Sequence, residues 1–519
     1  MQAFGMFCLI KKCLRLTIPE RIAHAQKVFC RSYGTRTIYA LSSGSTKCAV
    51  AVLRVSGPKS AVALQQICGG VPKMRKASLR RLYDPISKEL LDKSLVLWFP
   101  GPQSFTGEDC AEFHVHGGPA VIKSVLTALS SIPDMHPAQP GEFTKQAFLN
   151  GKLDLTEVEG LGDLIHAETE VQRKQALRQM DGDLKVLYSN WRTRLLKCLA
   201  NTEAFIDFHE EENIEDDILE NVFADTSSLN DEIKKHLNDN RQGERLRDGL
   251  NVVIAGEPNV GKSSLLNSIC QRPAAIVSPI AGTTRDIVET ALNIAGYPVL
   301  FSDTAGLRET NDPIEKEGVI RAVKRVMSSD ITIFVVDVQK QSQMLQEAVS
   351  LKDFLAYYKN ILGLTSETEN NPSGCVNKEN QMALVIDNSS EMLVVLNKID
   401  LIEFSSVSKF LNGNEDHVCA VSCVTGQGFD DFMENLVKKV KLLCGDPLQG
   451  SPSLTQARHR HHLGKCCLQL DQFAHMLSHD VVMAAERLRL AAGELGQVTG
   501  AVSAEDVLDV IFRDFCIGK

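Results

Sequence analysis

The chain has 519 residues, of which 44% are hydrophobic, and its formal net charge is −9 at pH 7. This length accommodates about three domains of ~100–200 residues, and the acidic balance argues against a protein that binds nucleic acid through a strongly basic surface. Any RNA contact is therefore expected to be a local patch or to be shared with a partner. The 15 cysteines are scattered without a CxxC pair, which favours a reducing compartment without a disulfide framework or structural zinc.

Residues 1–36 differ from the rest of the chain, because seven basic residues stand against one acid, Glu20, with apolar residues between them. No apolar run among them is long enough to span a membrane. This composition predicts a mitochondrial transit peptide that directs the chain to the matrix and is cleaved near Arg31. A basic tail is the alternative.

Short strands are predicted within residues 37–153, at 37–41, 48–57, 94–99 and 111–118. In the last of these, a period of two places Glu112, His114 and His116 on one face. Spacing alone leaves two interpretations of that face, a solvated strand surface or a metal pair.

Helical periodicity follows, with apolar residues at three- and four-residue spacings. It runs through 154–180 and 184–208 and returns in 454–497 and 504–515. Because a different pattern occupies residues 250–445, this segment is predicted to be a domain inserted into a helical one. The acidic run 210–217 is interpreted as a solvated helix flank, and residues 339–391 as a helix plus a mobile loop.

The inserted segment opens with a phosphate-binding motif. Gly256–Ser263 reads G-x-x-x-x-G-K-S and follows the apolar run 250–255, which is typical of a buried strand. The glycines let backbone N–H groups and a helix N-terminus face an anion, Lys262 adds a positive charge, and the Ser263 hydroxyl suits Mg²⁺. The sequence therefore predicts a nucleoside triphosphate site.

Three further motifs select the nucleotide. Asp303–Gly306 reads DTAG after a second apolar strand, where the aspartate reaches the Mg²⁺ shell and the glycine N–H a γ-phosphate. Asn397–Asp400 reads NKID after a third strand, and its aspartate suits the two N–H donors of guanine, while Ser422-Cys423 matches the last guanine-contacting loop. Four motifs in this order predict a GTPase, although Leu307 stands where Ras-type enzymes place a water-orienting glutamine. The predicted GTP-binding residues are Asn259, Val260, Gly261, Lys262, Ser263, Ser264, Ser278, Thr283, Thr284, Asp303, Thr304, Ala305, Gly306, Asn397, Lys398, Asp400, Ser422 and Cys423.

Gly282–Asp286 together with Asn259 resembles the MnmE (TrmE) family of tRNA-modifying GTPases, in which a potassium ion takes the place of an arginine finger. The chain also ends in that family's C-x-G-K tail, Cys516–Lys519. Further motifs similar to the family's amino-terminal domain are Thr37-Ile38, Arg54–Gly57, Ser104–Asp109, His116–Gly118, Gly141–Thr144 and Asn150–Lys152. The resemblance covers nearly all of the chain after residue 36, except residues 339–391.

The resemblance implies a set of ligands and catalytic residues. A reduced folate, 5,10-methylene- or 5-formyl-tetrahydrofolate, is expected at Arg54, Glu112 and Lys152, whose charges suit its carboxylates and its pterin N–H groups. The ions implied are Mg²⁺ at Ser263 and Thr284, and K⁺ at Asn259, Ser278, Ile280 and Thr283. Counting from the DTAG aspartate, Glu315 falls on the family's catalytic glutamate, and Cys516 is the second residue placed in the catalytic set.

The fold that the resemblance implies is a multi-domain α/β + α architecture, with a β-rich folate-binding domain, a helical domain and an inserted Ras-like P-loop GTPase domain. The expected divisions are the transit peptide 1–36, the folate-binding domain 37–153, the helical domain in parts 154–249 and 446–519, and the GTPase domain 250–445. A homodimer through the amino-terminal domain is expected, with GTPase domains that pair in the GTP state.

The function implied is a potassium-dependent GTPase that modifies carbon 5 of the wobble uridine of mitochondrial tRNAs, in the taurinomethyl form. It would act with an MnmG-type partner that carries FAD and would take a one-carbon unit from the folate. Two alternatives remain: an Era- or Der-like ribosome-assembly GTPase, and a folate enzyme with a regulatory GTPase that needs no flavin partner.

Overall fold

The computed structural model describes residues 36–44, 46–208, 217–272, 275–277, 289–303, 324–341, 391–402, 411, 414–446, 452–502, 508, 511–513 and 515–519. The chain divides into two compact units, which are described separately. The first comprises Met1–Gly162, Gln179–Leu199 and Arg489–Lys519, and the second comprises Asp163–Arg178 and Ala200–Leu488. Apart from Arg36, the predicted transit peptide lies outside the described residues.

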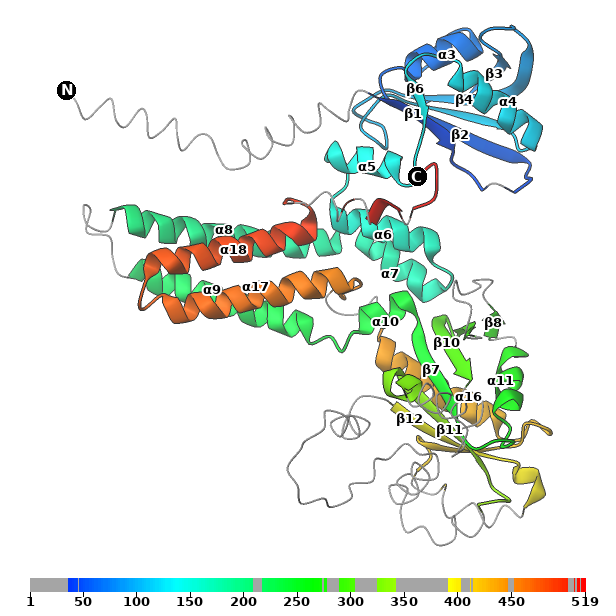
Figure 1. Cartoon of the computed structure of the whole chain (residues 1–519), viewed down its shortest axis with the longest axis vertical. Helices are drawn as coiled ribbons and strands as arrows, with labels where there is room; N and C mark the ends of the chain where they lie inside the picture. The colour runs from blue at the N-terminus through cyan, green and yellow to red at the C-terminus, as the bar shows by residue number, and fades with distance from the viewer. Residues whose placement is uncertain are drawn as a thin grey trace, which may run out of the picture. The chain divides into compact units, whose positions relative to one another are not determined.

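A six-stranded sheet forms the amino-terminal part of the first unit, with the strand order β3-β4-β5-β2-β1-β6 (Figure 1). Neighbouring strands are antiparallel except β1 and β6, which are parallel. The strands are β1 (Thr37–Leu41), β2 (Val50–Ser56), β3 (Ser78–Tyr83), β4 (Leu90–Phe99), β5 (Cys110–His116) and β6 (Met135–Pro137). Strands β3 and β6 are absent from the sequence prediction, because β6 has only three residues and β3 carries two adjacent arginines.

Helices α3 (Ser60–Cys68) and α4 (Pro119–Ser130) cover one face of this sheet. Leu64 of α3 and Val125 of α4 belong to the same buried cluster as Phe113 of β5. On β5 the side chains of Glu112, His114 and His116 on the other face are half-buried or exposed, although Cys110 on that face is buried. This face of the sheet is therefore open along much of β5, whereas at β1 it is covered, because Ile38 and Ala40 are buried with Phe143.

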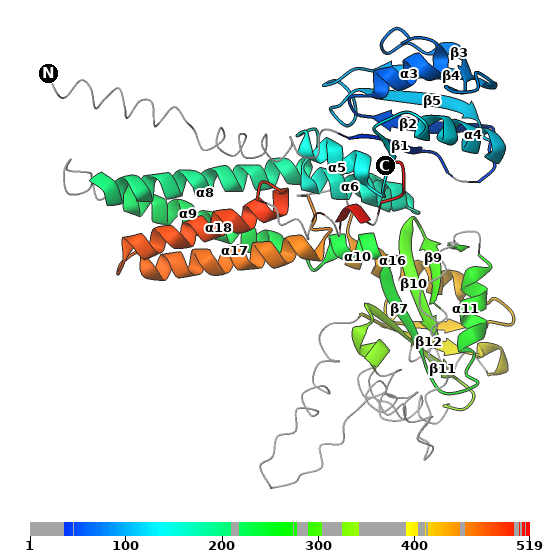
Figure 2. The same ribbon diagram turned by 45° about the horizontal axis from the view of Figure 1, so that its top comes forward.

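The helical segments lie on both sides of the second sheet in the sequence. They are α5 (Glu142–Leu149), α6 (Leu155–His166), α7 (Glu170–Met180), α8 (Asp183–Phe208), α9 (Asp217–Leu237), α10 (Gln242–Asp248), α17 (Ala457–Met476) and α18 (Val481–Thr499). In the second unit α9 and α17 lie side by side (Figure 2), where Asn230 Nδ2 and Lys234 Nζ donate to Asp471 Oδ1 over 2.7 and 2.8 Å.

The stretch 154–180, predicted as one helical pattern, is two helices with a break at residues 167–169. The main-chain N–H of Gln172 donates to Thr169 Oγ1 over 3.3 Å, and Gln172 Oε1 accepts from the N–H of Thr169 over 3.1 Å. This reciprocal pair is a capping box, which satisfies the free N–H groups at the start of α7. The helix therefore begins anew at Glu170.

A seven-stranded sheet forms the centre of the second unit, with the order β13-β12-β11-β7-β10-β9-β8. Strands β7, β10, β11, β12 and β13 are parallel, while β9 and β8 form an antiparallel edge. The strands are β7 (Leu250–Ala255), β8 (Ala275–Val277), β9 (Glu289–Ile294), β10 (Tyr297–Asp303), β11 (Ile331–Asp337), β12 (Glu391–Asn397) and β13 (Val418–Val421).

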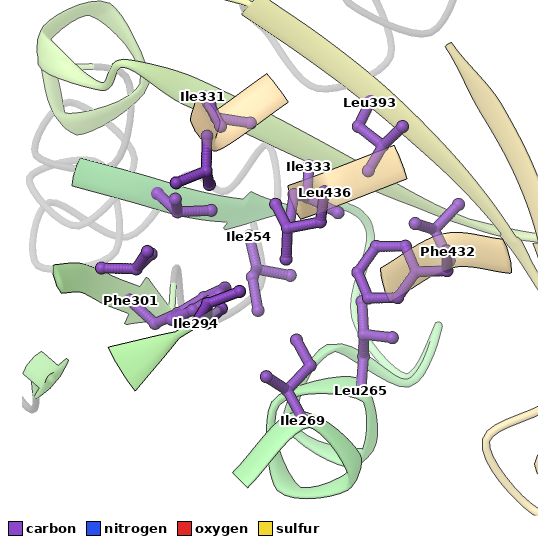
Figure 3. Close-up of a cluster of buried hydrophobic side chains, with 14 of the residues drawn as sticks. Ile254, Leu265, Ile269, Ile294, Phe301, Ile331, Ile333, Leu393, Phe432 and Leu436 are labelled. Carbon is purple, nitrogen blue, oxygen red and sulfur yellow. The ribbon is translucent and has the colours of Figure 1, made fainter. Parts of the chain in front are cut away.

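Helices α11 (Lys262–Cys270) and α16 (Phe429–Cys444) pack on this sheet through one hydrophobic cluster (Figure 3). Leu265 of α11 and Phe432 of α16 lie in the cluster with Ile254 of the central strand β7. Because β7 is buried along almost its whole length, the loop that leaves it is held on a rigid base.

Within the described residues, no helix has the length and apolar character needed to cross a membrane. The described parts of the chain also hold no group of three His, Cys, Asp or Glu side chains arranged for a metal ion, and the cysteines described there are free thiols.

Candidate functional site

The loop between β7 and α11 can adopt its path because two glycines are tightly enclosed. A Cβ at Gly256 would lie 2.5 Å from the carbonyl oxygen of Val335 on β11, and one at Gly261 would lie 2.3 Å from Asn397 Nδ2. Gly261 also has φ 101°, in the region that favours glycine. The motif glycines are therefore required by the neighbouring strands β11 and β12.

Lys262 begins α11 with its side chain buried in the same loop. Its Nζ donates to the carbonyl oxygens of Gly256 and Glu257, each over 2.9 Å. These contacts hold the ammonium charge inside the curve of the loop, next to the N-terminus of α11. Both features favour an anion such as a phosphate.

Asn397 joins the loop to two other predicted motifs. Its side chain is 2% exposed, its Nδ2 donates to Val260 O over 2.8 Å, and its Oδ1 accepts from the N–H of Cys423 over 3.4 Å. Burial raises the pKa of the Cys423 thiol, and the charge of the nearby Asp400 carboxylate raises it further. Asn397 therefore ties the loop of Cys423 to the phosphate loop.

Asp337 is absent from the residues predicted from sequence, although it belongs to this cluster. Its Oδ2 lies 2.6 Å from Lys398 Nζ, which also donates to the carbonyl oxygen of Asn259 over 3.2 Å. Asp337 is 2% exposed and pairs with Asn397 in the parallel register of β11 and β12. An acid at the end of a strand that is apolar except for Thr332 was the signal available in the sequence.

A pocket of about 360 Å³ opens beside the loop after β13, a size within the range of small-molecule sites. Its lining residues are Ser268, Gln271, Arg272, Cys423, Val424, Thr425, Gly426 and Phe429. The pocket brings the end of α11 to the loop that carries the predicted guanine contacts.

Several predicted site residues lie outside the described residues: Ser278, Ile280, Thr283, Thr284, Thr304, Ala305, Gly306 and Glu315. Asp303 is the last residue of β10, whose backbone pairs with β7. The structure therefore brings together the phosphate loop and the guanine motifs.

A second cluster lies on the open face of the six-stranded sheet. Arg54 of β2 stands opposite Glu112 of β5 in the strand register, and Arg54 Nε and Nη2 lie 3.1 and 3.0 Å from Glu112 Oε1. The Arg54 guanidinium lies over the rings of Phe105 and Phe143, at 5.4 and 5.8 Å from their centres. The two charged side chains are 16% and 19% exposed, so a ligand can reach them.

Lys152 reaches the same region from another direction, because its Nζ donates to Pro102 O over 3.2 Å in the loop that carries Phe105. The chain's end also arrives there: Ser42 Oγ donates to Gly518 O over 2.9 Å, and Ile517 forms an isolated bridge with Pro140. Exposed Cys516 belongs to this tail. The loop that carries Phe105 therefore lies beside Arg54 and Lys152, and the carboxyl-terminal tail packs near the same end of the sheet.

A parallel sheet whose central strand runs into a G-x-x-x-x-G-K-S loop, with an NKID motif hydrogen-bonded to that loop, defines a Ras-like P-loop GTPase domain. Family profiles described as the MnmE helical domain and the GTP-binding protein TrmE N-terminus match residues 155–516 and 37–152. The chain belongs to the MnmE (TrmE) family of tRNA modification GTPases.

Individual relatives agree with this assignment. The mitochondrial 5-taurinomethyluridine-tRNA synthase subunit GTPB3 of Danio rerio is 50% identical over an alignment 519 residues long, which covers 99% of this chain and 99% of that protein. The tRNA modification GTPase MnmE of Parvibaculum lavamentivorans is 46% identical over 93% of this chain and 100% of its own. A crystal structure of the Y63A variant of Aquifex aeolicus Era bound to GDP and AlF₄⁻ aligns with a TM-score of 0.25 at 23% identity, over 42% of this chain and 66% of that chain.

Replacing Asp400 by asparagine tests the guanine contact. A carboxylate accepts both N–H groups of the guanine edge, whereas an amide turns a donor toward one of them. A hydrogen bond to a charged group is worth ~1.5–3 kcal/mol, so GTP affinity should fall by about a hundredfold while affinity for xanthosine triphosphate rises. Titration with fluorescent nucleotides measures both, with exposed Asp416→Asn as the control. Unchanged GTP affinity in Asp400→Asn would exclude this contact.

Proposed function

We propose that the chain is a mitochondrial, potassium-dependent GTPase that acts with an FAD-carrying MnmG-type partner on carbon 5 of the wobble uridine of mitochondrial tRNAs. The product would be the taurinomethyl derivative. The observation that carries this proposal is 50% identity, over 99% of both chains, to a relative named as a mitochondrial 5-taurinomethyluridine-tRNA synthase subunit. The match of residues 155–516 to the MnmE helical domain argues against an Era- or Der-like ribosome-assembly GTPase.

Mass spectrometry of mitochondrial tRNA tests the function directly. Depletion of the chain should remove the taurinomethyl group from the wobble uridine, because the proposed modification depends on this GTPase. Re-expression of the wild-type chain should restore it and Lys262→Ala should not, since that variant loses the charge in the phosphate loop. Full modification after depletion would exclude the proposal.

The residues of the phosphate loop suit the two ions of the proposed site. Ser263 lies in the first turn of α11 and with Thr284 would hold Mg²⁺, which offsets phosphate charge. Asn259 has φ 64° and is exposed, and no described residue hydrogen-bonds its side-chain amide. Its neutral oxygen suits a potassium site shared with Ser278, Ile280 and Thr283. Glu315 is proposed to order the attacking water.

Hydrolysis should be faster in KCl than in NaCl, because a cation between the phosphates stabilises transition-state charge that an arginine finger stabilises elsewhere. Asn259→Ala should lose this difference. Since alanine at φ 64° adds backbone strain, Asn259→Gly separates the loss of the amide from strain and should lose the potassium response as well. Single-turnover hydrolysis in the two salts measures the effect, with Asn238→Ala as the control. Equal wild-type rates in both salts would contradict the assignment.

The proposed one-carbon donor, 5,10-methylene- or 5-formyl-tetrahydrofolate, would lie at Arg54, Glu112 and Lys152. The partly exposed Arg54–Glu112 pair offers a cation for a carboxylate and an acceptor for the pterin N–H groups. Cys516 is included in the catalytic set. A homodimer through the amino-terminal domain is also proposed, with GTPase domains that pair in the GTP state.

Arg54→Ala should weaken binding of 5-formyltetrahydrofolate by roughly ten- to a hundredfold, because one charged hydrogen bond is worth ~1.5–3 kcal/mol. GTP affinity should not change, since the nucleotide loop belongs to the other compact unit. Isothermal calorimetry with both ligands measures this, and Lys123→Ala on α4 is the matched control. Absence of folate binding by the wild-type chain would end the assignment.

A further inference from the structure

Residues 73–93 have a charge opposite to that of the whole chain. They contain seven basic and three acidic residues, whereas the formal net charge of the protein is −9. The segment includes strand β3, which is the edge of the six-stranded sheet, and the start of β4. Six of its cations are exposed, and we call them the basic edge: Lys73, Arg75, Lys76, Arg81, Lys88 and Lys93.

Two of the three acids of this segment, Asp84 and Asp92, accept hydrogen bonds from nearby groups. Asp84 Oδ1 accepts from the main-chain N–H groups of Ile86 and Ser87 over 2.9 and 2.7 Å. Asp92 accepts the N–H of His116 over 2.9 Å and lies 2.8 Å from its Nδ1. Burial alone would raise the pKa of Asp92, but these hydrogen bonds hold it below its ordinary value. Both carboxylates therefore remain charged and committed to local contacts.

The cations of the basic edge have no such partners. Across the described residues, none of the six lies within salt-bridge distance of an acid. Arg81 of β3 stands directly opposite Lys93 of β4 in the register, and like charges in that position destabilise a sheet. Charged side chains on the edge strand itself protect a sheet edge, and this does not account for Lys93, which lies on the second strand.

The position of the basic edge relates it to the proposed one-carbon site. Lys93 and Leu97 are four residues apart on β4, so their side chains share a face, about 13 Å apart along the strand. Leu97 pairs with Glu112, and Glu112 pairs with Arg54. Arg81, Lys93 and the Arg54–Glu112 pair therefore lie on one open sheet face. Arg75 extends the basic edge toward Lys152, because its guanidinium donates to Gln103 O in the loop that also binds Lys152.

We propose that the basic edge binds the phosphate backbone of the tRNA and holds it on the sheet face that carries the one-carbon site. This inference rests on the proposed function, which supplies the RNA. Exposed cations without an acidic partner, carried by β3, β4 and the segments that flank β3, suit a polyanion with regularly spaced charges, and contacts to phosphate position RNA without reading its sequence. A local patch also reconciles RNA binding with an acidic chain.

Charge reversal of Arg81 and Lys93 tests the inference in the full-length chain. Binding of a fluorescently labelled mitochondrial tRNA transcript is followed by anisotropy over a series of KCl concentrations. Each lost phosphate contact lowers the slope of log K against log salt by roughly 0.7–0.9. The double variant Arg81→Glu/Lys93→Glu should bind at least about tenfold more weakly with a slope lower by about 1.5, and each single variant should be intermediate.

Lys123→Glu is the matched control, because Lys123 is an exposed lysine on α4, which covers the opposite face of the same sheet. Its affinity and salt slope should equal those of the wild type. Potassium-stimulated GTP hydrolysis should be normal in all variants, which shows that they are folded. Conservative Arg81→Lys should retain binding because it keeps the charge.

Three outcomes would overturn the inference. In the first, the double variant binds tRNA with wild-type affinity and slope. In the second, the wild-type chain binds anionic phospholipid vesicles as tightly as it binds tRNA, and the double variant loses both interactions equally. This result would assign the surface to membranes. In the third, the variant changes oligomeric state in place of RNA affinity. If wild-type chain and partner modify tRNA while the double variant does so equally well, the inference fails and the proposed function stands. If the wild-type pair modifies nothing, the proposed function fails.

Discussion

The buried amide of Asn397 is the contact on which the nucleotide edge of the seven-stranded sheet depends. One side chain donates to the phosphate loop at Val260 and accepts from the loop after β13 at Cys423. Leaving a buried partner unsatisfied costs about 1–3 kcal/mol, so these two loops are fixed relative to each other by a single residue. The parallel register places Asp337 beside it, and the Asp337–Lys398 pair then anchors the next residue of the motif. The strand order therefore places Asn397, Asp337 and Lys398 together at one edge of the sheet.

The same sheet is tied to helices at its opposite end. The turn between β9 and β10 accepts a hydrogen bond at Gly296 O from the N–H of Val171 on α7. Asp330, just before β11, accepts from Arg245 of α10 over 2.7 Å and from the N–H of Asn251 over 2.9 Å. Because β10 ends at the DTAG aspartate, one strand joins this predicted nucleotide motif to the turn that contacts α7. Rigid strands thus link the nucleotide edge to helical segments that continue into the rest of the chain.

What the sequence could predict depended on how local the signal was. The phosphate loop, the NKID motif and the one-sided strand β5 follow from spacing within a few residues. The capping box at Thr169 has an equally local sequence pattern, although residues 154–180 were predicted as one helical stretch. The Asp337–Lys398 pair required the strand order, because 61 residues separate its members. The contact of Arg54 with Glu112 required the register of β2 against β5, whereas the family resemblance named both residues without showing how they meet. The seven cations in residues 73–93 were visible in composition, but the exposure of six of them and their lack of acidic partners among the described residues emerge only from the structure, which places β3 at the sheet edge.

The carboxyl-terminal tail shows how a short motif is constrained by the other end of the chain. Gly518 has φ 93°, and a Cβ there would lie 2.2 Å from the carbonyl oxygen of Leu41 on β1. Ser42 holds the Gly518 carbonyl across 476 positions of sequence. Burial lowers the pKa of Lys519, the charge of Arg54 lowers it further, and Glu112 opposes both, so the last residue lies in the electrostatic field of the proposed folate pair. The glycine of the C-x-G-K tail is therefore explained by close packing against the first strand, which brings Cys516 and Lys519 to a site whose other residues lie in the first third of the chain.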